Sequence, residues 1–151
     1  MANQNYKIFT IAETSPAAPG TVASSLLVNG LSGFDLITVD ADLVGATGGT
    51  LDVYLQRLVG DPATSTTWND WVHFPQLASG GAAIKYTLGV GMLTPTAITV
   101  VGRNLSPALA ANNFIQTPPG ERVRAVYVAG SGTSAGAALS ITLTGWKAPH
   151  L

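Results

Sequence analysis

Residues 37–56 read ITVDADLVGATGGTLDVYLQ and carry the alternation that decides the fold. In the first half, Ile37 and Val39 alternate with threonine and aspartate, and in the second half Leu51 and Val53 do the same. Successive residues of a β-strand point to opposite faces, so each half has one apolar and one polar face. The glycine-rich stretch GATGG between them indicates a turn. The segment therefore predicts two half-buried strands.

The same period of two extends over the rest of the chain. It is regular in residues 139–144 and less regular in residues 6–12, 22–28, 71–76, 84–90, 97–101 and 122–128. Glycine- and proline-rich turns separate these runs, which is typical of a sandwich or barrel of about nine short strands. One short helix at most is expected, at residues 106–113 (SPALAANN), with Ser106 as its cap and Pro107 at its first position.

Composition limits the classes of function. The chain has 151 residues, no cysteine and a formal net charge of -1, and only 10% of its residues are charged. Without a basic surface, nucleic-acid binding lacks its main energetic term. A weakly charged surface also favours association, so we expect an assembly. No signal peptide or membrane segment is expected, and residues 21–151 are predicted to form one sandwich domain.

Residues 1–20 allow two interpretations. Tyr6, Ile8, Phe9 and Ile11 form a strand-like run with apolar residues on both faces, which predicts burial on both sides. The run is either a contact arm that adds to the sheet of a partner or the first strand of the chain's own sandwich. These four residues are therefore candidates for a partner interface.

No constellation for catalysis is found. Residues 132–136 (GTSAG) match the G-x-S-x-G motif of a hydrolase, but no aspartate or glutamate follows Ser134, and the only later histidine is His150. His73 has no partner at the spacing of metal ligands. We therefore expect no enzyme, no metal and no cofactor.

Trp68 and Trp71 form an aromatic pair after a polar loop. Exposed tryptophans can stack on sugar rings, whereas buried ones anchor a core or a subunit interface. Packing or an interface is favoured over sugar, which makes both residues interface candidates.

Two stretches resemble small virion structural proteins of tailed bacteriophages. In residues 50–76 (TLDVYLQRLVGDPATSTTWNDWVHFPQ), a strand ending in L-Q is followed by a polar loop with Asp, then W-x-D, then F-x-Q. The positions are Leu55, Gln56, Asp61, Trp68, Asp70, Phe74 and Gln76. Residues 122–145 (RVRAVYVAGSGTSAGAALSITLTG) are similar to the companion pair of strands in the same proteins. Pro62 departs from the pattern, as does the Ala/Gly-rich loop after residue 130.

The resemblance implies a single-domain antiparallel β-sandwich, jelly-roll-like, that decorates or cements a phage capsid. The implied partner is the major capsid protein, and the location is the exterior of a virion assembled in the host cytoplasm. We expect a homo-oligomer, with a trimer favoured over a dimer because trimers suit the three-fold positions of an icosahedral lattice. A carbohydrate-binding adhesin on a head or tail appendage is the main alternative, and a hydrolase is the weakest.

Overall fold

The computed structural model describes residues 6–14, 22–31, 33–44, 50–78, 84–89, 107–115, 120–130 and 138–147. Within these ranges the chain forms ten strands and no helix. The all-β class predicted from the alternation is thus confirmed. No helix among the described residues is long and apolar enough to cross a membrane.

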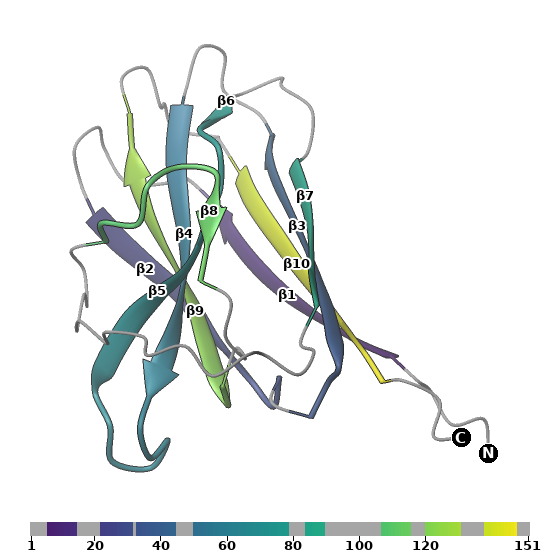
Figure 1. Ribbon diagram of the computed structural model, residues 1–151. Coiled ribbons are helices and arrows are strands. Elements are labelled where there is room, and N and C mark those ends of the chain that lie inside the picture. The colour runs from purple at the N-terminus through teal and green to yellow at the C-terminus, as the bar shows by residue number, and fades with distance from the viewer. Residues whose placement is uncertain are drawn as a thin grey trace.

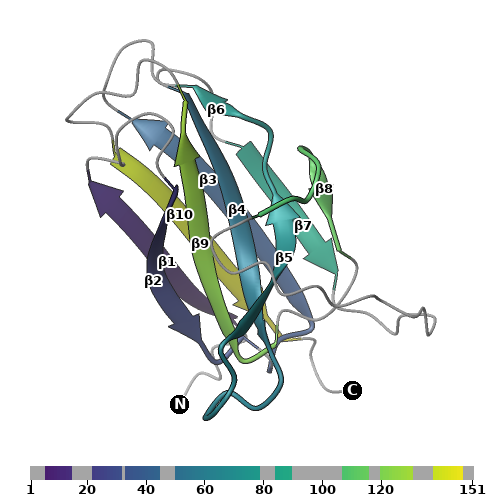
Figure 2. The same cartoon turned by 90° about the vertical axis from the view of Figure 1, so that its left-hand side faces the viewer.

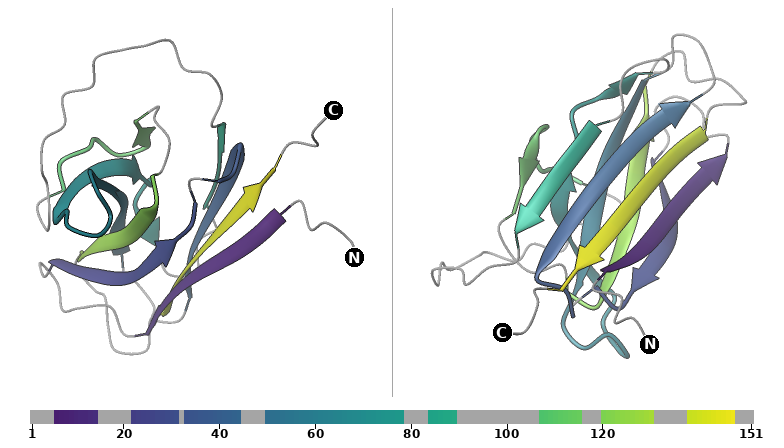
Figure 3. Two further views of the ribbon diagram at one scale, coloured as in Figure 1. Left: turned by 90° about the horizontal axis from the view of Figure 1, so that it is seen from below. Right: turned by 90° about the vertical axis from the view of Figure 1, so that its right-hand side faces the viewer.

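The strands form two antiparallel sheets that face each other (Figures 1 and 3). The first sheet has the order β1 (Tyr6–Thr14), β10 (Ala138–Trp146), β3 (Leu36–Val44) and β7 (Ile84–Gly89). The second has the order β2 (Val22–Asn29), β9 (Arg122–Ala129), β4 (Thr50–Val59), β5 (Thr67–His73) and β8 (Asn113–Phe114), with β6 (Leu77–Ala78) paired to β4.

The pairing of the strands follows one rule. Apart from the two-residue strands β6 and β8, the first strand pairs with the last, the second with the second-last, and so on inward: β1 with β10, β2 with β9, β3 with β7 and β4 with β5. Two further pairings, β10 with β3 and β9 with β4, join these strand pairs into the two sheets. This is the connectivity of a jelly roll, an antiparallel ribbon rolled up into two facing sheets.

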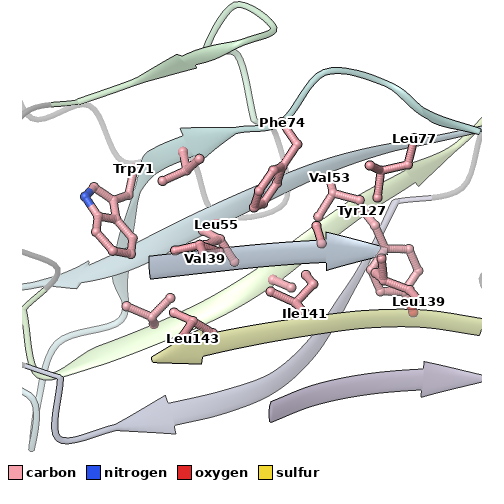
Figure 4. Packing of buried hydrophobic residues seen from close by; sticks show 14 of the residues in the cluster. Val39, Val53, Leu55, Trp71, Phe74, Leu77, Tyr127, Leu139, Ile141 and Leu143 are labelled. Atoms are coloured by element: carbon pink, nitrogen blue, oxygen red, sulfur yellow. The ribbon is translucent and has the colours of Figure 1, made fainter. Parts of the chain in front are cut away.

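The core lies between the sheets (Figure 4), and most of its strand residues alternate along the inner faces. Its buried members are Leu31, Ile37, Val39, Ala41, Leu51, Val53, Leu55, Trp71, Val72, Phe74, Leu77, Val123, Ala125, Tyr127, Leu139, Ile141 and Leu143. The half-buried rings of Phe9 and Phe34 pack against this cluster and against each other. Burial of this apolar surface is the main force that holds the two sheets together.

A β-bulge interrupts the pairing of β4 with β5. Leu55 pairs with Val72, whereas the next residue, Gln56, pairs with Asp70, so Trp71 is left without an opposite residue. A bulge inserts one extra residue into one strand and re-aims its side chains. Here Trp71 lies in the core, and Asp70 faces outward beside Gln56.

Strand β5 departs from the prediction of a strand at residues 71–76. It begins at Thr67 because a tight turn reverses the chain early: the Asp61 carbonyl accepts a hydrogen bond from the Ser65 amide at 2.8 Å, and its carboxylate accepts one from the Ala63 amide at 2.8 Å. The strand expected at residues 97–101 lies outside the described residues.

Residues 107–113 do not form the short helix considered for them. In a helix the amides of Ala108 and Leu109 would lie in the first turn, where they have no acceptor within the helix. Here they donate hydrogen bonds to the Asp70 carboxylate. The chain then continues into β8, which pairs with the end of β5 (Figure 2). The proposed cap, Ser106, lies outside the described residues.

The N-terminal run is a strand of the chain's own sheet. All nine residues of β1 pair with β10 in an unbroken antiparallel register, from Tyr6 opposite Trp146 to Thr14 opposite Ala138. Of the two interpretations of residues 1–20, the structure therefore shows the first strand for this part. Residues 1–5 and 15–20 lie outside the described residues.

Candidate functional site

The outer faces of the two sheets differ in exposure. On the second sheet, the outward-facing Gln56, Asp70 and His73 are buried. Residues 107–115, which continue into β8 beside β5 (Figure 2), bind Asp70 and His73 on this face. On the first sheet, large apolar side chains stay in contact with solvent at one end of β1 and β10. Exposed apolar clusters of this kind mark interaction sites more often than isolated exposed residues do.

Three side chains make up this exposed cluster, which we call the outer patch: Tyr6, Ile8 and Trp146. Their exposed fractions are 43%, 57% and 41%. Tyr6 and Trp146 are register partners, and their ring centroids lie 5.2 Å apart with planes tilted by 37°. The half-buried Leu36 on β3 pairs with Trp146 and extends the row onto the neighbouring strand.

The four interface candidates on β1 lie in different surroundings. Tyr6 and Ile8 point outward, whereas Phe9 points inward and meets the Phe34 ring edge-on at 6.1 Å. The side chain of Ile11 lies outside the described residues. The expectation that β1 is buried on both sides is wrong for its first residues, because only its inner face has a second sheet to pack against.

Trp68 and Trp71 are both buried within the domain and are not available to a partner or a sugar. Trp71 is 1% exposed and belongs to the core. Trp68 is 9% exposed on the other side of the sheet, where the guanidinium carbon of Arg124 lies 4.3 Å from the centroid of its ring. Burial against the chain's own residues removes both from the set of interface candidates.

Asp70 fastens residues 107–115 to the second sheet. One carboxylate oxygen accepts hydrogen bonds from the amides of Ala108 at 2.8 Å and Leu109 at 3.0 Å. The other accepts a bond from Nε2 of Gln56 at 2.9 Å. A buried carboxylate requires such donors, because an unpaired one is very costly to remove from water.

Gln56 connects this carboxylate to a positive charge. Its Oε1 accepts hydrogen bonds from Nε of Arg124 at 3.1 Å and from Nη2 at 2.8 Å. Burial lowers the pKa of Arg124 from its ordinary value. The amide of Gln56 therefore has one orientation only, with its nitrogen toward Asp70 and its oxygen toward Arg124.

His73 supplies the second fastening of the same segment. Its Nδ1 lies 2.7 Å from the Leu109 carbonyl oxygen, which only accepts, so Nδ1 carries the hydrogen. The imidazole stacks on Tyr54 with ring centroids 3.7 Å apart. Burial, and then the charges of Asp52 and Asp70, raise the pKa of Tyr54. The hydrogen bond to Leu109 and the stacking on Tyr54 thus hold His73 in place within the fold.

These contacts give the polar residues of the second sheet a structural role. Gln56 and Asp70, two residues of the resemblance described above, bond each other and hold a crossing segment in place. Within the described residues, no group of three or more His, Cys, Asp or Glu side chains is placed to hold a metal. The GTSAG stretch and His150 lie outside the described residues.

The sequence prediction missed Trp146 as a surface residue, although the alternation contains the signal. Leu139, Ile141 and Leu143 are buried, so residues an odd number of positions from them face outward. Trp146 lies three positions after Leu143 and therefore falls on the polar face. Its pairing with Tyr6 required the register of β1 with β10, which no local pattern contains.

Comparisons with protein-family models, with curated proteins and with solved structures find no match to this chain. Its function is therefore inferred from the fold and from the outer patch.

Proposed function

We propose that this chain is a structural virion protein that decorates and stabilises a bacteriophage capsid by binding between major capsid protein subunits. The observation that carries the proposal is a jelly roll with one outer face partly covered by residues 107–115 and the other bearing the exposed outer patch. Jelly rolls are common in viral capsid and lectin domains. The fold agrees with the resemblance seen in the sequence, but function rests on the surface.

The outer patch suits weak contacts that are repeated many times. Tyr6, Ile8 and Trp146 are each about half exposed, so complete burial stabilises a complex by about 1 kcal/mol per side chain. A stable interface needs roughly 800 Å² from each partner, so the patch forms the centre of a contact and its polar surroundings form the rim. A capsid offers the same contact at every lattice position.

The proposal includes self-association, with a trimer favoured over a dimer. The low charge of the chain, 10% of residues, leaves little repulsion between copies. A trimer fits a three-fold lattice position and presents three patches to the shell at once. Simultaneous contacts raise avidity without any new contact type.

A carbohydrate-binding adhesin is the second candidate, because exposed aromatic rings can stack on sugars. Trp68 and Trp71 do not support sugar binding because they are buried. Tyr6 and Trp146 are exposed, but their rings are tilted by 37° and do not form one flat stacking surface. The pair therefore fits the irregular surface of a protein better than the flat face of a sugar ring.

A binding experiment with purified particles that lack the protein tests the proposal. Ile8→Glu and Trp146→Ser place charge or polarity in the outer patch without touching the core, so we expect at least about tenfold weaker attachment, equivalent to about 1.4 kcal/mol. Phe114→Ser is the matched control, because Phe114 is 53% exposed but lies at the edge of the other sheet.

Attachment is measured by co-sedimentation and by the occupancy of density on the particle surface. Loss of attachment in both patch variants, with Phe114→Ser unchanged, supports the capsid contact. Unchanged attachment in the patch variants contradicts it. Loss of glycan binding in the same variants, with no attachment of the parent protein to particles, would replace it with the adhesin.

A further inference from the structure

Arg57 and Asn69 lie opposite each other on neighbouring strands of the second sheet. They are register partners across β4 and β5, and directly opposite residues of an antiparallel pair point to the same face. On its other side Arg57 pairs with Val123, a fully buried core residue. Arg57 and Asn69 therefore point to the inner face, where the alternation of Leu51, Val53 and Leu55 would place another apolar residue.

Both side chains keep buried donors without acceptors. Nε of Arg57 and Nδ2 of Asn69 are buried and have no hydrogen-bond partner among the described residues. Asn69 is only 4% exposed. Burial lowers the pKa of Arg57, and no neighbouring carboxylate in the described part of the chain offsets this effect. Buried polar groups in proteins nearly always have partners, so two adjacent donors without one require an explanation.

Arg124 shows what a partnered arginine looks like in the same sheet. Its Nε and Nη2 both donate to Gln56, and its guanidinium also lies over the ring of Trp68. Nε of Arg57 has no such acceptor within the described ranges, although the residue is half-buried like Arg124. Arg57 and Arg124 therefore differ in one respect. The Nε–H of Arg124 donates to a side chain of the same protein, whereas the Nε–H of Arg57 has no acceptor among the described residues.

We propose that Arg57 and Asn69 form a binding site for a carboxylate group. A carboxylate has two oxygens, one for the Arg57 guanidinium and one for the Asn69 amide, and its single negative charge matches the one positive charge present. A phosphate dianion would leave charge uncompensated. Arg57 as a whole is only half-buried, so part of its side chain is in contact with solvent.

The carboxylate belongs either to a small organic acid or to an aspartate or glutamate side chain of another protein. The site is a property of the isolated chain and exists whether or not the chain binds a capsid. Sodium acetate represents the first source, and the peptide acetyl-Gly-Asp-Gly-amide represents the second. Acetyl-Gly-Asn-Gly-amide is the control for the peptide, since it has the same shape without the charge.

The test follows the arginine Nε–H signals of the folded protein by nuclear magnetic resonance during titration with each probe. We expect the Arg57 signal to shift and saturate with acetate at a concentration on the order of 10 mM, as for a weak single ion pair. The Arg124 signal should stay in place because its Nε–H already donates to Gln56. Sodium chloride at equal ionic strength corrects for screening.

Asn69→Leu removes the amide donor at similar volume, and we expect acetate to bind roughly tenfold more weakly. If this variant does not fold, the titration of the parent protein still decides the question. Saturation by the aspartate peptide at lower concentration than acetate assigns the site to a protein partner, and the reverse order assigns it to a small acid. An Arg57 signal that does not saturate, or that moves together with Arg124, overturns the proposal.

Discussion

Arg124 donates hydrogen bonds to Gln56, and Gln56 donates one to Asp70, so every bond in this network runs toward the carboxylate. Exchanging the carboxylate of residue 70 with the amide of residue 56 tests this direction. Asp70→Asn puts an amide nitrogen against Nε2 of Gln56, so two donors face each other at a distance of 2.9 Å. Turning the Gln56 amide over relieves that contact but then sets its nitrogen against Nε and Nη2 of Arg124. Neither orientation satisfies all the groups.

The magnitude follows from the bonds that are lost. A hydrogen bond to a charged group contributes about 1.5 to 3 kcal/mol, and Gln56 and Asp70 are 0% and 3% exposed, so water does not replace it. We therefore expect Asp70→Asn to lower the free energy of unfolding by about 3 kcal/mol. Gln56→Glu alone places two carboxylates side by side and should cost about as much, because like charges at this distance repel strongly.

The double variant Asp70→Asn with Gln56→Glu restores the network with its direction reversed at one bond. The oxygen of the new amide at position 70 would accept from the Ala108 and Leu109 amides, its nitrogen would donate to the new carboxylate at position 56, and that carboxylate would pair with Arg124. The net charge equals that of the parent. We expect the double variant to lose only about 1 kcal/mol, against about 6 kcal/mol if the two single losses simply added, so the favourable coupling is about 5 kcal/mol.

Equilibrium unfolding in urea at neutral pH, followed by tryptophan fluorescence, measures the parent, the two single variants and the double variant. Native fluorescence at zero urea and an unchanged dependence on urea concentration show that each variant unfolds from the same folded state. If the losses of the two single variants add within about 0.5 kcal/mol in the double variant, the residues are not coupled and the network as described is wrong.

Three further measurements test other parts of the structure. Trp71→Ala should lower the free energy of unfolding by about 3 to 5 kcal/mol because it leaves a cavity in the core, and a smaller loss than about 1 kcal/mol would place the ring elsewhere. Folding favours the neutral Tyr54 phenol, whose pKa is raised above 10.0, so its contribution is complete below pH 10 and is lost as the pH rises through the folded value. Phenylalanine cannot ionise, so the urea midpoint of Tyr54→Phe should fall less than that of the parent as the pH rises above 10. Gly145→Ala would put a methyl group 2.5 Å from Cγ of Phe34 and should cost about 1 to 3 kcal/mol, whereas Gly33→Ala, with nothing within 4 Å, should cost less.

Alternation along the chain predicted which side chains face the core. Ile37, Val39, Leu51 and Val53 are all fully buried, as expected from their spacing of two. A strand with one polar and one apolar face has a single stable orientation, so this part of the fold follows from local pattern. The order of the strands within each sheet depends on contacts between residues that are distant in the sequence. Local pattern therefore did not predict it.

Trp71 shows where local pattern fails. The prediction began a strand at this residue, whereas it lies within β5 as the extra residue of a bulge. A bulge shifts the alternation of inward and outward side chains by one residue. Counting in steps of two along β5 therefore does not give the faces on which both Asp70 and Trp71 lie. The Asp70 network was therefore beyond reach from the sequence, although Gln56 and Asp70 were already noted as part of a pattern.

The position of β10 also determines how the chain reaches its native state. β10 lies between β1 and β3 and pairs with both, so residues 6–14 and 36–44 have no shared sheet until residues 138–146 arrive. Contacts between such distant segments require large loops to close first, and folds dominated by them fold in milliseconds to seconds rather than microseconds. During synthesis the first strand must therefore emerge from the ribosome long before its neighbour exists. In that interval its edge and the side chains of Tyr6 and Ile8 are open to contacts between nascent chains.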